Sequence, residues 1–208
     1  MRTSALAAAC LSLSASLFAT GATGAEEGKH PTLDYNNQAA WKGVLDQAQS
    51  PIDIVTTDAK PAQANEARAI VLRHLDRASG TAEDNGHAVQ FNSHATEATI
   101  RGRHFRMVQF HMHADSEHTI DGKSFPLEGH FVFQAQDGRL AVVGVMYEPG
   151  RPNRAIQGIL DQLAGTDAKP KSATLDIRPL LPTRLSYYHY LGSLTTPPLT
   201  QNVEWYVL

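Results

Sequence analysis

The sequence predicts a mainly β, single-domain protein, and three observations support this fold class. The chain has 208 residues, a length that suits one large domain. Its best-defined apolar runs alternate with polar residues at the period of two that a half-buried strand requires. Only one stretch shows helical spacing, because Ile156, Ile159, Leu160 and Leu163 form one stripe of a helix that ends before Gly165. We therefore expect a surface helix over a β core.

The first 25 residues resemble a secretory signal peptide. Arg2 is followed by an apolar, small-residue run from Ala5 to Ala19 and by further small residues up to Ala25. We expect cleavage after Ala25, a periplasmic or secreted location, and no membrane contact after cleavage. Cys10 is the only cysteine, so the mature chain would fold without a disulfide. The net charge of −3, with scattered Lys and Arg, argues against a nucleic-acid surface.

The mature chain begins with an arm of little periodicity, residues 26–48, which predicts irregular structure. A turn at residues 49–51 leads into a short strand, and residues 56–67 predict a polar loop. Turns are also expected at residues 76–86 and 93–97. Further strands or extended segments are predicted at residues 69–74, 87–92, 98–101, 104–113, 127–133, 139–147, 175–182, 187–190 and 203–208, with an ordered loop at residues 192–198.

Two of these strands present histidines to a common side. Side chains on a strand alternate between its two faces, so every second residue points the same way. The polar faces of the two strands carry Gln109, His111 and His113 on one, and Glu128, His130 and Val132 on the other. The opposite face of the first strand is expected to carry Val108, Phe110 and Met112.

Three histidines on these faces predict a catalytic zinc site. Such a site takes three protein ligands and keeps its fourth position for water. His111 and His113 lie two residues apart on one strand, and His130 is on the right face of the other to be the third ligand. A ligating histidine needs its other ring nitrogen held by an oxygen. Gln109 and Glu128, each two residues before a histidine, are predicted to provide that oxygen.

A second class of metalloprotein fits part of the same motif. His111, His113 and Glu117 match the H-x-H-x3-E spacing of cupins, in which Glu117 would itself bind iron or manganese. The residues before His130 do not follow the usual cupin pattern. Elemental analysis would separate the two interpretations.

Six separated motifs follow one another along the chain: QSPIDI at residues 49–54, NGHA at 85–88, QFHMH at 109–113, SEHT at 116–119, EGH at 128–130 and YLGSLTTPPL at 190–199. Together they resemble an α-class carbonic anhydrase of the bacterial, exported type, from about Trp41 to the last residue. The resemblance implies a central, mostly antiparallel, twisted β-sheet with a few short peripheral helices. It also implies a Zn2+ enzyme that reversibly hydrates carbon dioxide to bicarbonate and a proton.

The resemblance implies a role for each site residue. Zinc would be bound by His111, His113 and His130. Thr195 would take a hydrogen bond from zinc-bound hydroxide and pass its own hydroxyl proton to Glu117. His87 matches the family's proton shuttle, and an imidazole pKa of about 6.5 suits that transfer. The apolar pocket for carbon dioxide would include Val132, Val142, Leu194, Thr196 and Trp205.

The chain departs from the family pattern in three places. Leu199 stands where exported members often have a cysteine, the N-terminal arm lacks the usual histidine-tryptophan opening, and the family continues beyond the residue matching Trp205 whereas this chain stops at Leu208. Residues 26–208 are therefore expected to be a catalytic domain without the family's C-terminal part. Because that part normally supports the middle histidine, His113 here, we expect a weakened or unstable enzyme if the mature chain ends at Leu208.

A non-catalytic carbonic anhydrase-like binding module is the remaining alternative. Such relatives usually lose one or more zinc histidines, and this chain keeps all three. The expected partner is a small molecule, carbon dioxide or bicarbonate, and a homodimer is left open.

Overall fold

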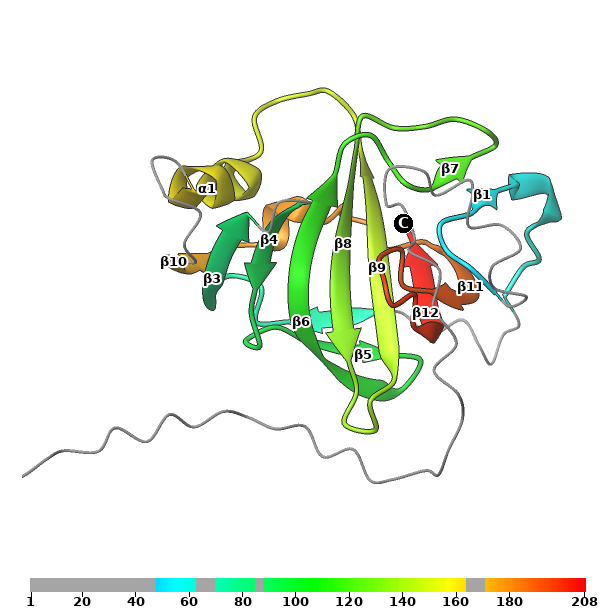
Figure 1. Ribbon diagram of the computed structural model, residues 1–208, viewed down its shortest axis with the longest axis horizontal. Coiled ribbons are helices and arrows are strands. Elements are labelled where there is room, and N and C mark those ends of the chain that lie inside the picture. Colours follow the sequence, from blue (N-terminus) through cyan, green and yellow to red (C-terminus); the bar gives the residue numbers. More distant parts are fainter. Residues whose placement is uncertain (1–47, 63–69, 85–87, 164–170) are drawn as a thin grey trace, which may run out of the picture. The chain divides into compact units, whose positions relative to one another are not determined.

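A ten-stranded mixed sheet dominates the computed structural model, which describes residues 48–62, 70–84, 88–163 and 171–208 (Figure 1). The main path of the sheet runs β10-β3-β4-β6-β8-β9-β12-β11, and β5 pairs with β6 and carries β2. All neighbouring strands are antiparallel except β9 and β12. The prediction of a mainly β fold with a mostly antiparallel sheet is confirmed.

The bounds of the elements follow the chain. The strands are β1 (Asp53–Ile54), β2 (Val71–Arg73), β3 (Ala78–Asp84), β4 (Val89–Asn92), β5 (Glu97–Ile100), β6 (Arg103–His113), β7 (Thr119–Ile120), β8 (Leu127–Gln134), β9 (Leu140–Tyr147), β10 (Lys171–Leu175), β11 (Tyr188–Ser193) and β12 (Gln201–Val207). The helices are α1 (Arg154–Leu163) and the 3-10 turns η2 (Thr56–Asp58) and η3 (Arg178–Leu180).

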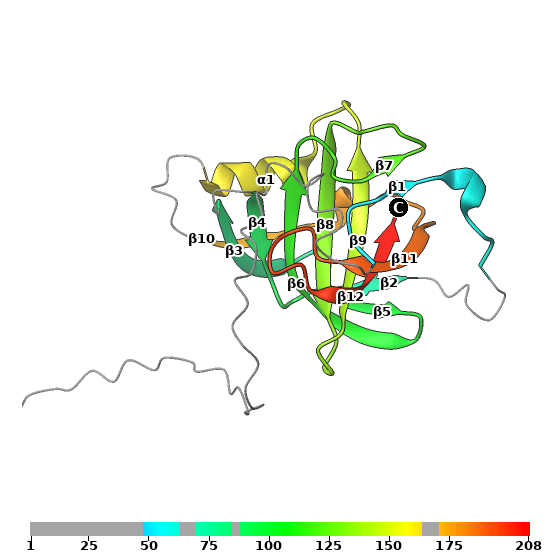
Figure 2. The ribbon, with the colours of Figure 1, turned by 45° about the vertical axis from the view of Figure 1, so that its right-hand side comes forward.

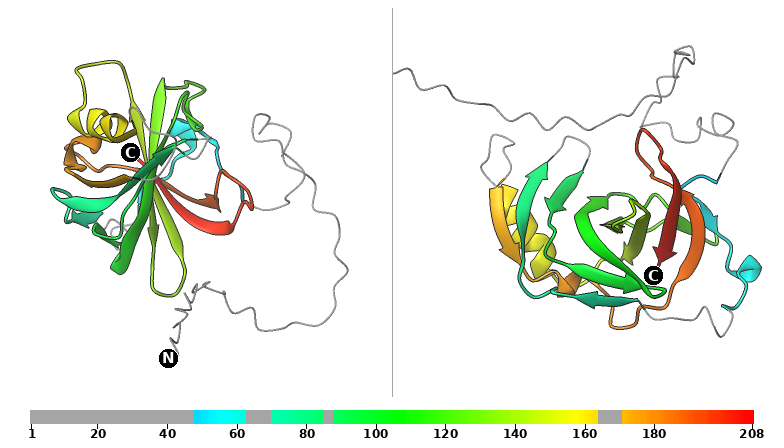
Figure 3. Two further views of the ribbon diagram at one scale, coloured as in Figure 1. Left: turned by 60° about the vertical axis from the view of Figure 1, so that its left-hand side comes forward. Right: turned by 90° about the horizontal axis from the view of Figure 1, so that it is seen from below.

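The long strands β6, β8 and β9 form the centre of the sheet, and the strands fan out around them with a pronounced twist (Figures 1 and 3). Their apolar side chains divide between two clusters. The larger cluster includes Phe110, Phe131 and Phe133 and is covered by α1, whose Ile159 is fully buried. The smaller cluster includes Val132, Val142 and Trp205. Because side chains alternate along β8, the two clusters occupy opposite faces of the sheet, and the histidines share the face of the smaller one.

A β-bulge in β6 changes the predicted sorting of its side chains. The pairing of β6 with β8 shifts between Met107 and Gln109, so Val108 is an extra residue on β6. Met107 and Phe110 are both fully buried in the larger cluster, whereas Val108 lines a cavity beside Gln109. The prediction that Val108 shares a face with Phe110 is therefore wrong. The histidine side of the prediction holds because the bulge ends before Gln109.

Two segments differ from their predicted structure. Residues 76–86 were expected to be a turn, yet β3 occupies most of them and pairs with β4 and β10. Gly80 explains the misleading composition, because a side chain there would lie 2.0 Å from the carbonyl oxygen of Asn92. Residues 175–182 were expected to be extended, but β10 ends at Leu175 and η3 follows, with Pro179 in its first turn, where a fixed φ is favourable.

Smaller differences concern β7, a strand not predicted, and β11, which extends to Ser193 and so takes up the start of the expected loop. β7 pairs in parallel with β1 as a separate two-stranded sheet (Figure 2). The expected signal peptide, the irregular arm up to residue 47 and His87 lie outside the described residues. Within the described parts of the chain, no helix has the length and apolar character needed to cross a bilayer.

Candidate metal centre

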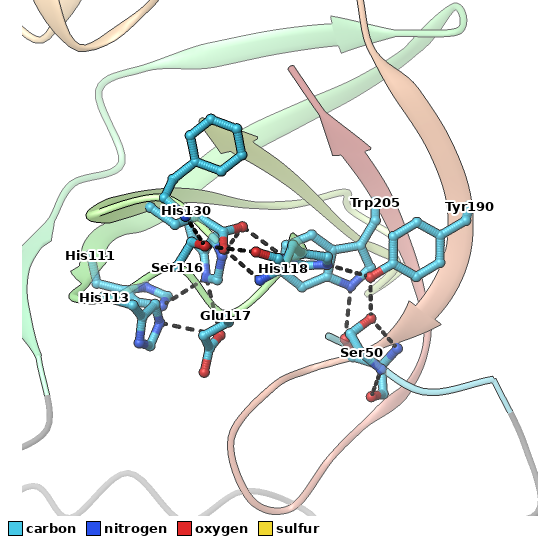
Figure 4. Close-up of polar contacts among 12 residues, drawn as sticks. Ser50, His111, His113, Ser116, Glu117, His118, His130, Tyr190 and Trp205 are labelled. Atoms are coloured by element: carbon cyan, nitrogen blue, oxygen red, sulfur yellow. Dashed lines mark hydrogen bonds and ion pairs between the residues drawn. The ribbon is translucent and has the colours of Figure 1, made fainter. Parts of the chain in front are cut away.

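The antiparallel pairing of β6 with β8 brings three histidines together. His111 lies directly opposite His130 in the register, and His113 follows two residues later on the same face of β6. Each pair of rings among His111, His113 and His130 has its centroids 4.7 to 5.0 Å apart. One nitrogen of each ring lies within 4.8 Å of the others, and all three residues are buried (Figure 4).

Two of the rings are held by oxygens on their outer side. Gln109 Oε1 lies 2.7 Å from His111 Nδ1, and Glu128 Oε1 lies 2.8 Å from His130 Nε2. Both oxygens can only accept, so both of these ring nitrogens carry the proton and donate it. The other nitrogens, His111 Nε2 and His130 Nδ1, face each other 3.2 Å apart.

This arrangement suits a cation. In neutral rings the two facing nitrogens present lone pairs to each other, which is unfavourable unless a positive charge lies between them. Zinc binds imidazole nitrogen at about 2.0–2.1 Å, so two nitrogens on one tetrahedral zinc are separated by about 3.4 Å. The 3.2 Å separation of His111 Nε2 and His130 Nδ1 is close to that value. The residues present therefore fit a zinc ion.

The surroundings of His111 and His113 favour the neutral form of both rings. Burial, with the neighbouring His130 and His113 rings, lowers the pKa of His111 well below its usual value. Burial and His130 lower the pKa of His113 to about 4, although Glu117 acts in the opposite direction. Neutral imidazole is the form that binds a metal, so these shifts favour metal binding at neutral pH.

Glu128 is a buried carboxylate shared by two histidines. Its Oε1 accepts from His130 Nε2 and from His118 Nδ1, both at 2.8 Å, and its Oε2 accepts from the backbone N–H of His118 at 2.9 Å. Burial alone would raise the pKa of Glu128, but His130 and the hydrogen bonds from both rings hold it below its ordinary value. A charged Glu128 strengthens its hold on the His130 ring.

Glu117 lies beside the three histidines, in the segment between β6 and β7. Its Oε2 is 3.5 Å from His113 Nε2 and 3.9 Å from His130 Nδ1. The Glu117 side chain is only 7 % exposed, so this acceptor faces the ring nitrogens inside the protein.

A cavity of about 230 Å³ opens beside the histidines. His111, His130 and Gln109 form one side of it, and Thr195 reaches it from the loop after β11. All five residues expected in a substrate pocket lie on its wall: Val132, Val142, Leu194, Thr196 and Trp205. Val108, Gln134 and Leu140 complete the lining and were not foreseen.

Three polar residues around this centre, Ser50, His118 and Tyr190, were not predicted from the sequence. His118 has no exposed surface and contacts Glu128 through Nδ1 and Tyr190 through Nε2 (Figure 4). Tyr190 in turn contacts Ser50. Each lies inside a recognised motif, but no residue spacing connects Ser50, His118 and Tyr190, because they come from three distant segments.

Known proteins are similar to this chain in sequence and in fold. The family model for eukaryotic-type carbonic anhydrase matches residues 36–208. The carbonic anhydrase of Pectobacterium atrosepticum is 42% identical over 135 residues, which cover 62% of this chain and 55% of the relative. Alpha carbonic anhydrase 6 of Arabidopsis thaliana is 35% identical over 199 residues, which cover 88% of this chain and 75% of the relative.

A solved structure agrees with these matches. The α-carbonic anhydrase of Thermovibrio ammonificans, solved in complex with the inhibitor sulfanilamide, superposes with a TM-score of 0.73 at 31% identity, covering 82% of this chain and 75% of that one. The chain spans 51% to 64% of the length of the first three curated relatives that it matches. The extent of the family match, the fold and the relatives together place the chain in the eukaryotic-type, or α, carbonic anhydrase family.

Proposed function

We propose that the chain is a zinc-dependent carbonic anhydrase that reversibly hydrates carbon dioxide to bicarbonate and a proton. The observation that carries this proposal is the pair of facing nitrogens, His111 Nε2 and His130 Nδ1, 3.2 Å apart with His113 beside them. The outer hydrogen bonds to Gln109 and Glu128 leave both nitrogens free to bind a metal. Family membership supplies the reaction class.

The protein's own residues would hold and orient the reactants. A zinc ion bound by His111, His113 and His130 would lower the pKa of a water molecule to about 7, a figure known from carbonic anhydrase itself, and so supply hydroxide at neutral pH. Thr195 would accept a hydrogen bond from the nucleophile and donate its own proton to Glu117. Both residues support this role by position, since Thr195 lies on the cavity wall and Glu117 beside His113.

The apolar wall of the cavity suits a neutral, nonpolar substrate. The wall includes the apolar side chains of Val132, Val142 and Leu194. Such a surface favours contact with a nonpolar molecule such as carbon dioxide over contact with water. Trp205 also lines the pocket and is 1% exposed. Bicarbonate, the product, is charged, so the apolar wall does not stabilise it and we expect it to leave the pocket.

His87 is proposed as the proton shuttle on the evidence of its NGHA motif alone. An imidazole that titrates near neutral pH can pass protons between the metal centre and buffer. Its contribution is expected to appear at low buffer concentration and to be rescued by added imidazole.

The proposal is tested by metal analysis together with carbon dioxide hydration. Purified protein should contain about one zinc per chain, lose hydration activity on chelation, and regain it with zinc. Iron or manganese in place of zinc would instead support the cupin-type alternative, in which Glu117 is a ligand. Zinc binding without hydration would indicate a non-catalytic binding module.

We also propose that the protein is exported after removal of residues 1–25. Mass spectrometry of the protein from a periplasmic fraction should give an N-terminus at Glu26. Recovery of the intact N-terminus from the cytoplasm would contradict export. A homodimer stays a prediction, which sedimentation of the purified protein would check.

A further inference from the structure

A network of buried and partly buried hydrogen bonds connects the candidate metal centre to the segment that precedes β1. The Tyr190 hydroxyl lies 2.7 Å from Ser50 Oγ and 2.6 Å from His118 Nε2. His118 Nδ1 lies 2.8 Å from Glu128 Oε1, the oxygen that also accepts from His130. The polar chain therefore runs from Ser50 through Tyr190, His118 and Glu128 to His130 (Figure 4).

The same chain branches toward the loop that carries Thr195. The backbone N–H of Ser50 donates to Ser193 Oγ at 3.0 Å, and the backbone N–H of Ser193 donates to Ser50 Oγ at 3.2 Å. Ser193 Oγ donates to the carbonyl oxygen of Leu194 at 2.9 Å, one residue before Thr195. Ser50 thus joins two parts of the site that are distant in sequence, His130 and Thr195.

Two glycines leave space for the side chains of this hydrogen-bond network. A Cβ on Gly192 would lie 2.2 Å from Ser50 Oγ, and one on Gly144 would lie 3.2 Å from Glu128 Oε1. His118 and Glu128 have no exposed surface, and Ser50 is 4% exposed. Polar groups this deeply buried lose water on folding, so each bond must be made inside the protein.

We propose that Ser50, Tyr190 and His118 are positioning residues, which fix the His130 ring on one side and the Thr195 loop on the other. The inference rests on the proposed function, because it assumes that His130 holds zinc. Glu128 accepts three hydrogen bonds, and two of them come from His118. If the His118 ring tilts, Glu128 follows, and the direction of His130 Nδ1 changes with it.

The Tyr190→Phe variant tests this directly. It removes only the hydroxyl and keeps a ring that stacks on Trp205, where the two planes are 8° apart. We expect zinc to bind about tenfold more weakly, the lower end of the loss typical when support of a metal ligand is removed, a range taken partly from carbonic anhydrases. The visible spectrum of the cobalt(II)-substituted variant should change, because it reports the geometry of the ligands.

Tyr147→Phe is the matched control. Tyr147, like Tyr190, is a partly buried tyrosine, and its hydroxyl donates to the carbonyl oxygen of Leu180 at 2.8 Å. The control should lower thermal stability but leave zinc affinity and the cobalt spectrum unchanged. Ser50→Ala is a second test and should weaken zinc binding in the same direction as Tyr190→Phe.

Three outcomes separate the possibilities. Wild-type protein that binds no zinc would overturn the proposed function itself. The positioning role alone would be overturned if the wild-type protein binds zinc and the folded Tyr190→Phe or Ser50→Ala variant keeps the wild-type zinc affinity and cobalt(II) spectrum. Equal loss of zinc affinity in Tyr147→Phe would also overturn it, because general destabilisation would then be sufficient.

Discussion

His111 and His130 lie opposite each other on paired strands, with Nε2 of the first 3.2 Å from Nδ1 of the second. Gln109 and Glu128 accept hydrogen bonds from the protonated nitrogens of these two rings. The unprotonated nitrogens, His111 Nε2 and His130 Nδ1, therefore direct their lone pairs toward each other. A cation at this point removes the repulsion between these lone pairs and should stabilise the whole fold.

Zinc is therefore expected to raise the melting temperature of the protein. A ligand that binds only the folded state adds about 4 kcal/mol when its free concentration is a thousand times its Kd. Calorimetry of zinc-free protein with and without added zinc measures the effect. His113→Ala should remove most of this stabilisation, and an unchanged zinc response in that variant would contradict its role as a ligand.

Gln109→Leu tests the support of His111 without changing a proposed ligand. Loss of the acceptor 2.7 Å from His111 Nδ1 frees the ring to rotate and to exchange tautomers. Zinc should bind about 10- to 100-fold more weakly, a range that derives partly from carbonic anhydrases. Gln134→Leu is the control, since Gln134 lines the same cavity but lies on an exposed part of β8. Competition with a chelator gives both affinities.

Thr195→Val separates metal binding from chemistry. Valine keeps the shape of the side chain but has no hydroxyl, so it lacks both hydrogen bonds proposed for Thr195, one with the nucleophile and one with Glu117. Carbon dioxide hydration should fall roughly 100-fold, as on losing one well-placed hydrogen bond in a transition state. Zinc affinity should stay unchanged, because Thr195 lies on the cavity wall and not among the three histidines. A parallel loss of zinc would mean that the variant disturbs the site itself.

The sequence predicted the parts of the site that follow strand periodicity. Gln109, His111 and His113 alternate along one strand, so their common face needed no knowledge of tertiary structure. Val108 could not be placed, because a bulge depends on the register with β8 and leaves no local signal. His118 and Tyr190 were missed for a related reason, since their contact spans 72 residues.

The same limit applies to the outer strands. β3 contains Gly80 and several polar residues, a composition typical of turns, and becomes a strand only by pairing on both sides. Tertiary contacts decide such segments more than intrinsic preference does.

Gly129 provides a test of packing behind the site. Two aromatic rings pack directly against Gly129, so there is no room for a side chain at this position. A Cβ there would lie 2.8 Å from the Phe110 ring and 3.0 Å from the Tyr147 ring. Gly129→Ala should destabilise the fold by about 1–3 kcal/mol through overpacking. Gly150→Ala is the control, since its Cβ would meet nothing closer than 3.9 Å. Urea denaturation of both variants checks the difference.

Tyr147 should contribute to the stability of the fold at alkaline pH. Burial raises its pKa above the ordinary value of a tyrosine, so the hydroxyl stays neutral in the folded protein while it ionises near pH 10 in the unfolded chain. The unfolded state then binds fewer protons than the folded state, and stability falls as the pH rises above about 10. Below pH 10 both states keep the proton, and this contribution is fully present.

Tyr147→Phe should separate two effects of the same hydroxyl. At pH 7 the variant loses the hydrogen bond to the carbonyl oxygen of Leu180, at a cost of about 1 kcal/mol. Between pH 10 and pH 11 its free energy of unfolding should fall less steeply than that of the wild type, because it has no phenol to ionise at this position. Urea denaturation across this range measures the slope. Parallel slopes in the two proteins would show that Tyr147 does not account for the alkaline loss.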